Sequence, residues 1–213
     1  RRRNYIPPDK FPYESSAGLT YDSGNYEPTL DRALEMAGYD DLRAEQQRRR
    51  DSGDHKHLGI GVATYVEMCG LAPSRVLASL NYAAGGWEAA SVRVLPTGKV
   101  QVVSGTTPHG QGHETTWSQI VADRLGIDPG DIEVLHSDTA VSPLGMDTYG
   151  SRSLPVGGVA VAMATDEVIA KARTIAAHQL ECAEDDLELV DAELRARGTP
   201  SKAMTLQAVA FAA

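Results

Sequence analysis

The segment Gly105–Thr116, with the sequence GTTPHGQGHETT, decides how this chain of 213 residues is interpreted. It follows a predicted strand at residues 99–103 and precedes a predicted helix at residues 115–125. A glycine-rich turn between a strand and a helix leaves the first backbone N–H groups of the helix unpaired, which suits an anion such as a phosphate. Gln111 stands between two glycines, so its amide can donate and accept hydrogen bonds with little steric shielding. A purely structural start of the helix is the alternative interpretation.

Other known patterns fit this segment poorly. The third glycine of a dinucleotide fingerprint is replaced by Thr115, and no Gly-Lys-Ser/Thr sequence makes a P-loop. His109 and His113 suggest a zinc site, but Trp117 occupies the position at which the zincin pattern needs its second histidine. We therefore expect an anion or cofactor cradle, or a structural turn, in preference to a metal site.

A second polar loop is predicted from Ser137 to Pro155, and it contains the sequence GSRS at residues 150–153. Long loops inside compact domains are commonly functional. The Arg152 guanidinium could pair an oxyanion through two hydrogen bonds. The alternative is a surface loop with the Arg152 side chain in solvent.

A hydrolase is a weaker alternative for the second loop. A triad could be assembled from Ser151, His136 and Asp138, but the sequence has no nucleophile elbow. His136 is expected in a strand and His178 in a helix, where each is more simply a structural residue.

The composition is that of a globular protein, with 42% hydrophobic and 23% charged residues, which excludes disorder, collagen and coiled coil. A formal net charge of −9 argues against nucleic acid as the main partner. Cys69 and Cys182 have no CxxC spacing and are expected to be free thiols. No run of 18 apolar residues occurs, so we expect no transmembrane segment and a cytoplasmic location.

The hydrophobic periodicity predicts an α+β fold in two parts. Residues 1–57 are expected to form an extended lead and a linker helix broken near Gly38, and residues 58–213 the main domain. Within the main domain we predict strands at 59–66, 91–95, 99–103 and 132–136, helices at 115–125 and 159–183, an edge hairpin at 187–195 and a helix from Met204. The chain lacks an initial Met and ends in what reads as the start of a helix. We therefore expect it to be a piece of a longer protein.

The two loops together resemble those of the molybdenum-binding large subunit in the xanthine dehydrogenase and aldehyde oxidase family, most closely the aerobic carbon monoxide dehydrogenases. The resemblance rests on TPHGQGHETT at 107–116, DTYGSRS at 147–153 and RRRNYI at 1–6. It extends over essentially the whole chain. It implies an α+β molybdopterin-binding domain in an oxidoreductase that oxidises its substrate with oxygen derived from water.

The resemblance also implies cofactor-binding residues. In the family, the glutamine of the Gly-Gln-Gly loop hydrogen-bonds the molybdenum centre and its pterin, which gives this role to Gln111, with close backbone access at Gly110 and Gly112. The Gly-Ser-Arg-Ser loop lies against the pterin and the dinucleotide, which gives contact roles to Gly150, Ser151, Arg152 and Ser153. Molybdenum is held by the dithiolene sulfurs of the cofactor, so no protein ligand to the metal is expected.

The implied cofactor is molybdopterin cytosine dinucleotide with molybdenum. FAD and [2Fe-2S] centres are expected on partner chains, a medium and a small subunit, within an oligomeric parent enzyme. The family's catalytic glutamate in its Gly-Glu context has no counterpart here, and neither has the cysteine loop that holds copper in carbon monoxide dehydrogenases. We assign no catalytic residue, Glu114 included, and expect the chain alone to be inactive.

Two functional questions stay open at this point. The substrate of the parent enzyme could be carbon monoxide, an aldehyde or an N-heterocycle, because the loop that distinguishes them is missing. A non-catalytic binding or scaffold domain of the same fold is the alternative to an enzyme.

Overall fold

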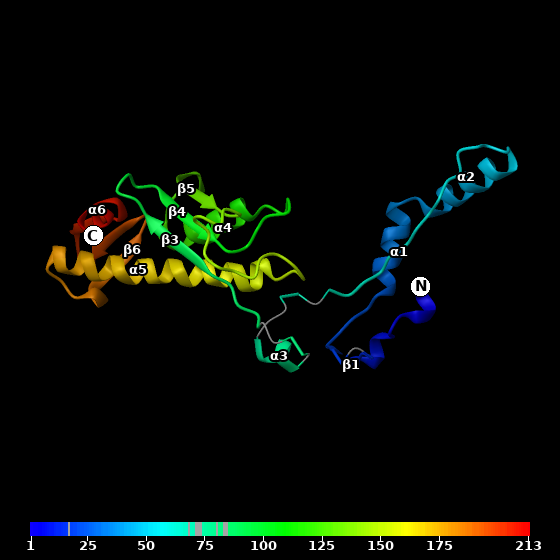
Figure 1. Cartoon of the computed structure of the whole chain (residues 1–213), viewed down its shortest axis with the longest axis horizontal. Helices are drawn as coiled ribbons and strands as arrows, with labels where there is room; N and C mark the ends of the chain where they lie inside the picture. The colour runs from blue at the N-terminus through cyan, green and yellow to red at the C-terminus, as the bar shows by residue number, and fades with distance from the viewer. Residues whose placement is uncertain (17, 68, 71–73, 80, 83–84) are drawn as a thin grey trace. The chain divides into compact units, whose positions relative to one another are not determined.

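The computed structural model describes residues 1–16, 18–67, 69–70, 74–79, 81–82 and 85–213. The chain forms two compact units, Arg1–Val66 and Glu67–Ala213, which Figure 1 colours from blue to red along the sequence. The assignment of separate roles to residues 1–57 and 58–213 stays a prediction.

The N-terminal unit consists of short elements with little core. Its elements are η1 (Arg2–Asn4), η2 (Pro8–Lys10), the antiparallel ribbon β1 (Tyr13–Glu14) and β2 (Thr20–Tyr21), and the helices α1 (Glu27–Met36) and α2 (Tyr39–Asp51). As predicted, Gly38 separates the two helices, in a left-handed conformation with a φ of 60°. Among the described residues of this unit, Leu30 alone is buried.

The prediction of a strand at residues 59–66 is wrong. Residues 58–66 have no regular secondary structure, although Val62 and Val66 follow the apolar alternation of a strand. A strand requires a hydrogen-bonded neighbour, and no strand within the described residues pairs with this segment.

The C-terminal unit contains the predicted hairpin, helix and strand. The strands β3 (Ala90–Val94), β4 (Val100–Ser104) and β5 (Ile132–Leu135) form a sheet in the order β3-β4-β5. β3 and β4 are antiparallel, whereas β4 and β5 are parallel and joined through α4 (His113–Leu125) and the turn η3 (Pro129–Asp131). The short helix α3 (Ser74–Ser79) precedes this sheet in the sequence.

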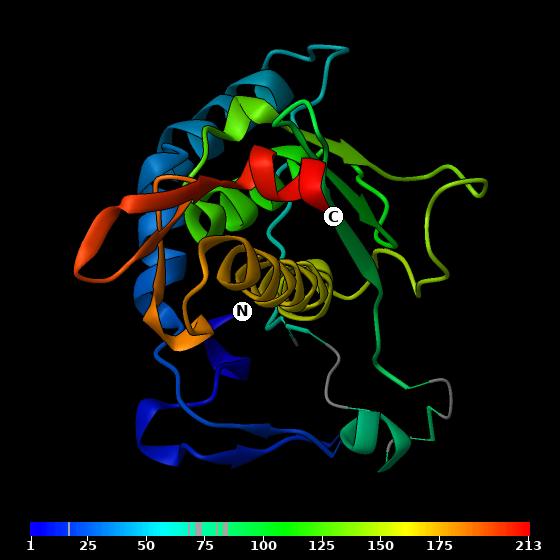
Figure 2. The ribbon, with the colours of Figure 1, turned by 90° about the vertical axis from the view of Figure 1, so that its left-hand side faces the viewer.

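One face of this sheet packs against α4 and α5 (Val159–Leu180), and Figure 2 shows both helices on the same side of the strands. The core between them contains Val100 and Val102 of β4, Trp117 and Val121 of α4, and Val161, Ala172 and Ala176 of α5. A π-helical turn, η4 (Ser153–Gly158), precedes α5. A Cβ atom at Gly157 would come within 2.7 Å of Thr106 Cγ2, so glycine allows this turn to lie against the residues that follow β4.

A second sheet completes the unit. It is antiparallel and formed by β6 (Leu187–Val190), β7 (Glu193–Ala196) and β8 (Thr199–Thr205), between η5 (Glu184–Asp186) and α6 (Leu206–Ala212). The predicted hairpin is confirmed, with β6 at an edge of this sheet and β7 at its centre, because β7 also pairs with β8. The helix expected from Met204 begins two residues later, because Thr205 caps it by accepting a hydrogen bond from the Ala208 backbone N–H. Together the helices and sheets confirm the predicted α+β class.

The segment Ser153–Leu180 is, within the described part of the chain, the one helical stretch long and apolar enough to cross a membrane. Its residues Val161, Ala172 and Ala176 are buried in the core of the unit. One face of this helix therefore packs in the core of the unit.

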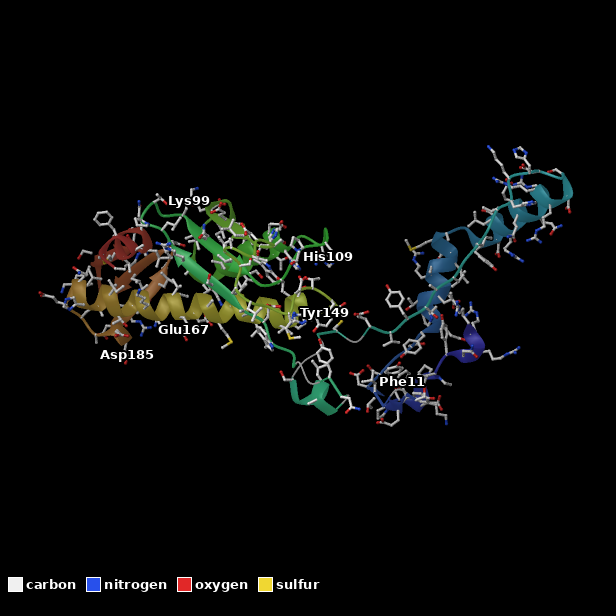
Figure 3. The ribbon with its side chains drawn as sticks, in the orientation of Figure 1. Phe11, Lys99, His109, Tyr149, Glu167 and Asp185 are labelled. Atoms are coloured by element: carbon white, nitrogen blue, oxygen red, sulfur yellow. The ribbon has the colours of Figure 1, made fainter. Side chains whose placement is uncertain are left out.

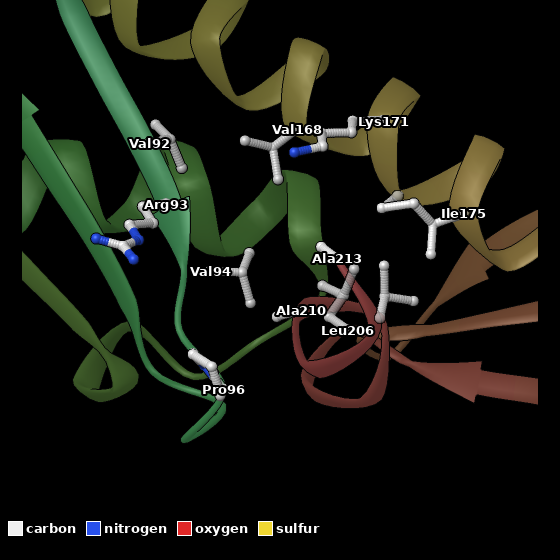
Figure 4. A pocket seen from close by; sticks show the side chains of 12 residues that line it. Val92, Arg93, Val94, Pro96, Val168, Lys171, Ile175, Leu206, Ala210 and Ala213 are labelled. Carbon is white, nitrogen blue, oxygen red and sulfur yellow. The ribbon is translucent and has the colours of Figure 1, made fainter.

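An apolar groove of about 360 Å³ lies between β3, α5 and α6 (Figure 4). Its lining includes Val94, Ile175 and Leu206. Arg93 and Lys171 are its only charged lining residues among those described. Figure 1 places α6 at the end of the unit opposite to the loops that follow β4 and β5.

Candidate cofactor-binding site

Three strand ends meet at one edge of the first sheet. Ser104 at the end of β4 pairs with Ala90 at the start of β3, and Val103 pairs with Leu135 at the end of β5. Both polar loops follow this edge, and Figure 3 shows His109 and Tyr149 at the same end of the unit. The carboxyl ends of parallel strands are where open α/β sheets bind ligands. The topology therefore brings the two predicted site loops to a position suited to binding.

The turn at Gly110–Gly112 is the open tip of the first loop. Gly110 and Gly112 have φ values of 97° and 81°, which favour glycine, and a Cβ atom on either would meet nothing within 4 Å. Gln111 is exposed, and its Oε1 accepts a hydrogen bond from the His109 backbone N–H at 2.5 Å. This bond holds the exposed side chain in the turn.

Helix α4 begins directly after this tip. Gly112 is its N-cap residue, and no side chain caps the helix there. His113, the first helical residue, is only 3% exposed, and neither ring nitrogen has a hydrogen-bond partner in the described part of the chain. The ring packs on Trp117 with 5.0 Å between centroids, and burial lowers the pKa of His113 below its ordinary 6.5.

His136 pairs with a carboxylate of α4 and does not form a hydrolase triad. Its Nε2 lies 2.8 Å from Glu114 Oε1 and its Nδ1 lies 3.0 Å from Ser137 Oγ. Hydrogen bonds from its own backbone N–H and from His136 lower the pKa of Glu114. Ser151 Oγ donates instead to Glu67 Oε1 at 2.5 Å, so its hydroxyl is not bonded to a histidine.

The described residues hold no cluster of three or more His, Cys, Asp or Glu side chains suited to a metal ion. His109 is exposed whereas His113 is buried, so the two histidines of the zinc interpretation differ in environment. Cys69 and Cys182 are free, as predicted.

The four residues of the GSRS segment are divided between surface and interior. Gly150 and Ser151 are exposed, both with positive φ, whereas Arg152 and Ser153 are buried. The Ser153 hydroxyl lies 2.9 Å from the Thr148 hydroxyl, which ties the loop to the start of η4. Within this segment, Gly150 and Ser151 are therefore the two residues that solvent reaches.

Arg152 is fully buried, so the alternative that placed its side chain in solvent is wrong. Its Nη1 donates to Glu88 Oε2 at 2.7 Å and to the Asp147 carbonyl at 2.5 Å, and its Nη2 donates to the Trp87 carbonyl at 2.5 Å. The side chains of Arg152 and Glu88 are both 0% exposed. All three hydrogen bonds are made to groups of the protein itself. A contact from Arg152 to a cofactor stays a prediction.

The two loops contact each other at their bases. The Thr107 backbone N–H donates to Asp147 Oδ1 at 2.8 Å. Partial burial acts to raise the pKa of Asp147, but hydrogen bonds from the Thr107 hydroxyl and backbone N–H outweigh it and lower the pKa. Gly105 and Gly145 approach so closely that a Cβ atom at Gly145 would lie 2.9 Å from Gly105 Cα.

Sequence reasoning missed Glu88 as a residue of this site. The predicted hairpin contained the signal, because a register that pairs Ser91 with Val103 places the residues just before β3 beside Gly105. An acidic residue at such a position, close to a loop that carries an arginine, is a candidate partner for that arginine.

Comparisons with known proteins show the family of the chain. The molybdopterin cofactor-binding domain model matches residues 32–213. The chain is 41% identical over its full length to the carbon monoxide dehydrogenase large chains of Afipia carboxidovorans and Hydrogenophaga pseudoflava. It is 32% identical over its full length to the nicotine 6-hydroxylase large subunit of Paenarthrobacter nicotinovorans. It spans about a quarter of these relatives, 26%, 26% and 25% of their lengths.

Solved structures show the same likeness. The carbon monoxide dehydrogenase of Oligotropha carboxidovorans matches the whole chain with a TM-score of 0.64 and 40% identity, and 27% of that protein's chain is covered. Quinoline 2-oxidoreductase from Pseudomonas putida 86 matches the whole chain with a TM-score of 0.69 and 33% identity, with 26% of its chain covered. These matches confirm the resemblance that the two loop sequences indicated. The chain belongs to the family of molybdopterin cofactor-binding domains.

Proposed function

We propose that this chain is the cofactor-binding part of the large subunit of a molybdenum hydroxylase, and that the Gly110–Gly112 tip holds the cofactor. The observation that carries this proposal is the tip itself, which is open, uncapped and placed at the carboxyl edge of β4. A scaffold domain has no need of such an exposed glutamine between two positive-φ glycines.

The residues at the tip fit a molybdopterin dinucleotide. The cofactor offers a hydrogen-bonding ring system and phosphates, and the tip offers the Gln111 amide and the start of α4, where the N-cap residue Gly112 makes no side-chain cap hydrogen bond. The absence of Cβ atoms at Gly110 and Gly112 leaves room for close backbone approach. From the second loop, the Gly150 backbone and the Ser151 hydroxyl would add polar contacts.

When bound, the cofactor supplies the redox centre at which the parent enzyme oxidises its substrate with oxygen derived from water. Gln111 would orient this centre by hydrogen bonding. The relatives are named as a large chain and a large subunit, which supports placing the iron–sulfur centres and FAD on small and medium partner subunits. A cytoplasmic location and an oligomeric parent are part of the same proposal.

Carbon monoxide is the proposed substrate of the parent enzyme. The support is the identity of 41% to carbon monoxide dehydrogenase large chains, against 32% to a nicotine 6-hydroxylase large subunit. Aldehydes and N-heterocycles are the alternatives. We expect the 213-residue chain to be inactive by itself.

The test is to purify the full-length parent with its operon neighbours and to measure molybdenum, copper and released cytosine nucleotide. Molybdenum with cytosine nucleotide and copper would support carbon monoxide oxidation. Molybdenum and nucleotide without copper would move the substrate to an aldehyde or an N-heterocycle. Neither metal nor nucleotide, in cells shown to make the cofactor, would contradict the proposal and favour the scaffold domain.

A further inference from the structure

Glu88 lies where three segments of the C-terminal unit meet, and no loop motif includes it. It precedes β3, and its carboxylate reaches the bases of both loops that follow β4 and β5. A Cβ atom at Gly105 or at Gly145 would overlap its Oε1. The carboxylate is therefore wedged between two glycines, one from each loop.

Hydrogen bonds fix both oxygens of this carboxylate. Oε1 accepts from the Ala89 backbone N–H at 3.1 Å. Oε2 accepts from the Met146 backbone N–H at 3.3 Å and from Arg152 Nη1 at 2.7 Å. Because Arg152 also donates to the Asp147 carbonyl, the backbone on both sides of Met146 is bonded to this ion pair.

The connection continues into the first loop. Asp147, whose carbonyl is held by Arg152, accepts the Thr107 backbone N–H with its side chain. Thr107 lies four residues before Gln111 in the same loop. Glu88 thus reaches the glutamine loop through Arg152, Asp147 and Thr107, besides its direct contact with Gly105.

Such an ion pair stabilises one arrangement more than it stabilises the fold as a whole. A buried pair returns little net stability beyond the cost of desolvating both charges, whereas removal of one partner leaves an uncompensated buried charge. Its carboxylate and guanidinium have fixed geometry, so they set the spacing of the backbone groups that they bind. The Glu88–Arg152 pair is therefore suited to set the spacing of the two loops.

We propose that Glu88 is a positioning residue of the cofactor site, whose buried carboxylate holds the glutamine loop and the GSRS loop at the spacing at which both contact one cofactor. This inference rests on the proposed function. A ligand binds with an apparent affinity lowered by the fraction of molecules in the binding-competent arrangement. Loss of the Glu88 charge therefore weakens cofactor retention through loop position.

The test uses the full-length subunit in its complex, with the variants Glu88→Gln, Glu88→Asp and, as a matched control, Leu194→Ala. Leu194 is fully buried in the second sheet, away from both loops. Its truncation destabilises the core by an amount comparable to the loss of a buried charge partner. Retained molybdenum and cytosine nucleotide, and the unfolding temperature, are measured for each variant.

We expect Glu88→Gln to retain at least about tenfold less cofactor than the wild type, because few molecules keep both loops in the competent arrangement. We expect Leu194→Ala to lower the unfolding temperature at least as much while it retains cofactor at the wild-type level. Glu88→Asp keeps the charge and is expected to retain more cofactor than Glu88→Gln. If Glu88→Gln yields no folded subunit, the same comparison is made between Glu88→Asp and Leu194→Ala, with partial cofactor loss expected in Glu88→Asp alone.

Equal cofactor retention in the Glu88 and Leu194 variants at equal loss of unfolding temperature would show that Glu88 serves the fold only and would overturn the inference. The proposed function would then still stand, because the wild type retains the cofactor. A wild-type subunit without molybdenum and cytosine nucleotide would overturn the proposed function, and this inference with it.

Discussion

The tip and the base of the glutamine loop use glycine for different physical reasons. At the tip, Gly110 has open space around it and is required by its φ of 97°. At the base, Gly105 is required because Glu88 and Gly145 leave no room for a side chain. The tip is thus shaped by backbone conformation and is free to meet a ligand, whereas the base is shaped by packing and fixes the loop. Substitutions at the tip should damage binding with little effect on the fold, whereas substitutions at the base should damage the fold and, through the position of the loops, binding as well.

The largest effect is expected from Arg152→Met at the base. The variant leaves the fully buried Glu88 carboxylate without its cation, which should cost about 3–5 kcal/mol of unfolding free energy. Urea denaturation of the 213-residue chain, followed by the fluorescence of the buried Trp117 and the exposed Trp87 together, measures it. The control is Arg195→Met, which removes a partly exposed pair with Glu193 and should cost less than about 1 kcal/mol. Similar losses in both variants would show that the buried pair has no special role.

A smaller difference in unfolding free energy is expected between alanine substitutions at two glycines. Gly145→Ala places a Cβ atom against Glu88 Oε1 and the backbone of Gly105, and should destabilise the chain by about 2–3 kcal/mol. Gly110→Ala meets no atom within 4 Å and carries only backbone strain, about 1 kcal/mol. The same urea titrations decide the order. A larger loss in Gly110→Ala would contradict the distinction between tip and base.

The buried His113, which directly follows the tip in the sequence, should make the stability of the chain depend on pH. Burial lowers its pKa in the folded chain, so the unfolded chain takes up this proton first as the pH falls. Stability should therefore fall as the pH drops from about 6.5 to the lowered pKa and level off below it, as far as His113 is concerned. His113→Leu should flatten the curve of unfolding free energy against pH in this window. An unchanged slope would mean that the imidazole is charged in the folded chain or is not buried.

Much of the fold follows from local pattern. The hairpin around Gly98, the helix after the glutamine loop, strand β5 and helix α5 each show a clear hydrophobic period and a clear end signal, and all four form. The predictions failed where the structure of a segment depends on a partner strand that is distant in the sequence. Residues 59–66 alternate as a strand does but find no pairing strand among the described residues, and β8 contains Pro200 and Lys202, which local pattern does not favour in a strand.

The tip of the site could be predicted, and its base could not. The residues of the tip adjoin one another in the sequence, so their spacing carries the signal. The base joins Glu88, Gly105 and Arg152, which are brought together only by the hairpin register and the return of the second loop. For this reason Arg152 could be interpreted as a solvent-exposed side chain, although it is fully buried.

The smallest effect on stability is expected from Gln111→Ala, because this side chain is exposed and bonds only the His109 backbone among its described neighbours. Its unfolding free energy should stay within about 0.5 kcal/mol of the wild type. Gln119→Ala, which truncates an exposed glutamine of α4, is the matched control.

The most direct test of the account is the molybdenum and cytosine nucleotide content of the full-length subunit carrying Gln111→Ala or Gln119→Ala. We predict that Gln111→Ala lowers cofactor content or, with cofactor still bound, turnover, and that Gln119→Ala leaves both at the wild-type level. Wild-type cofactor content together with wild-type turnover in Gln111→Ala would contradict the claim that the open tip of the glutamine loop holds the cofactor.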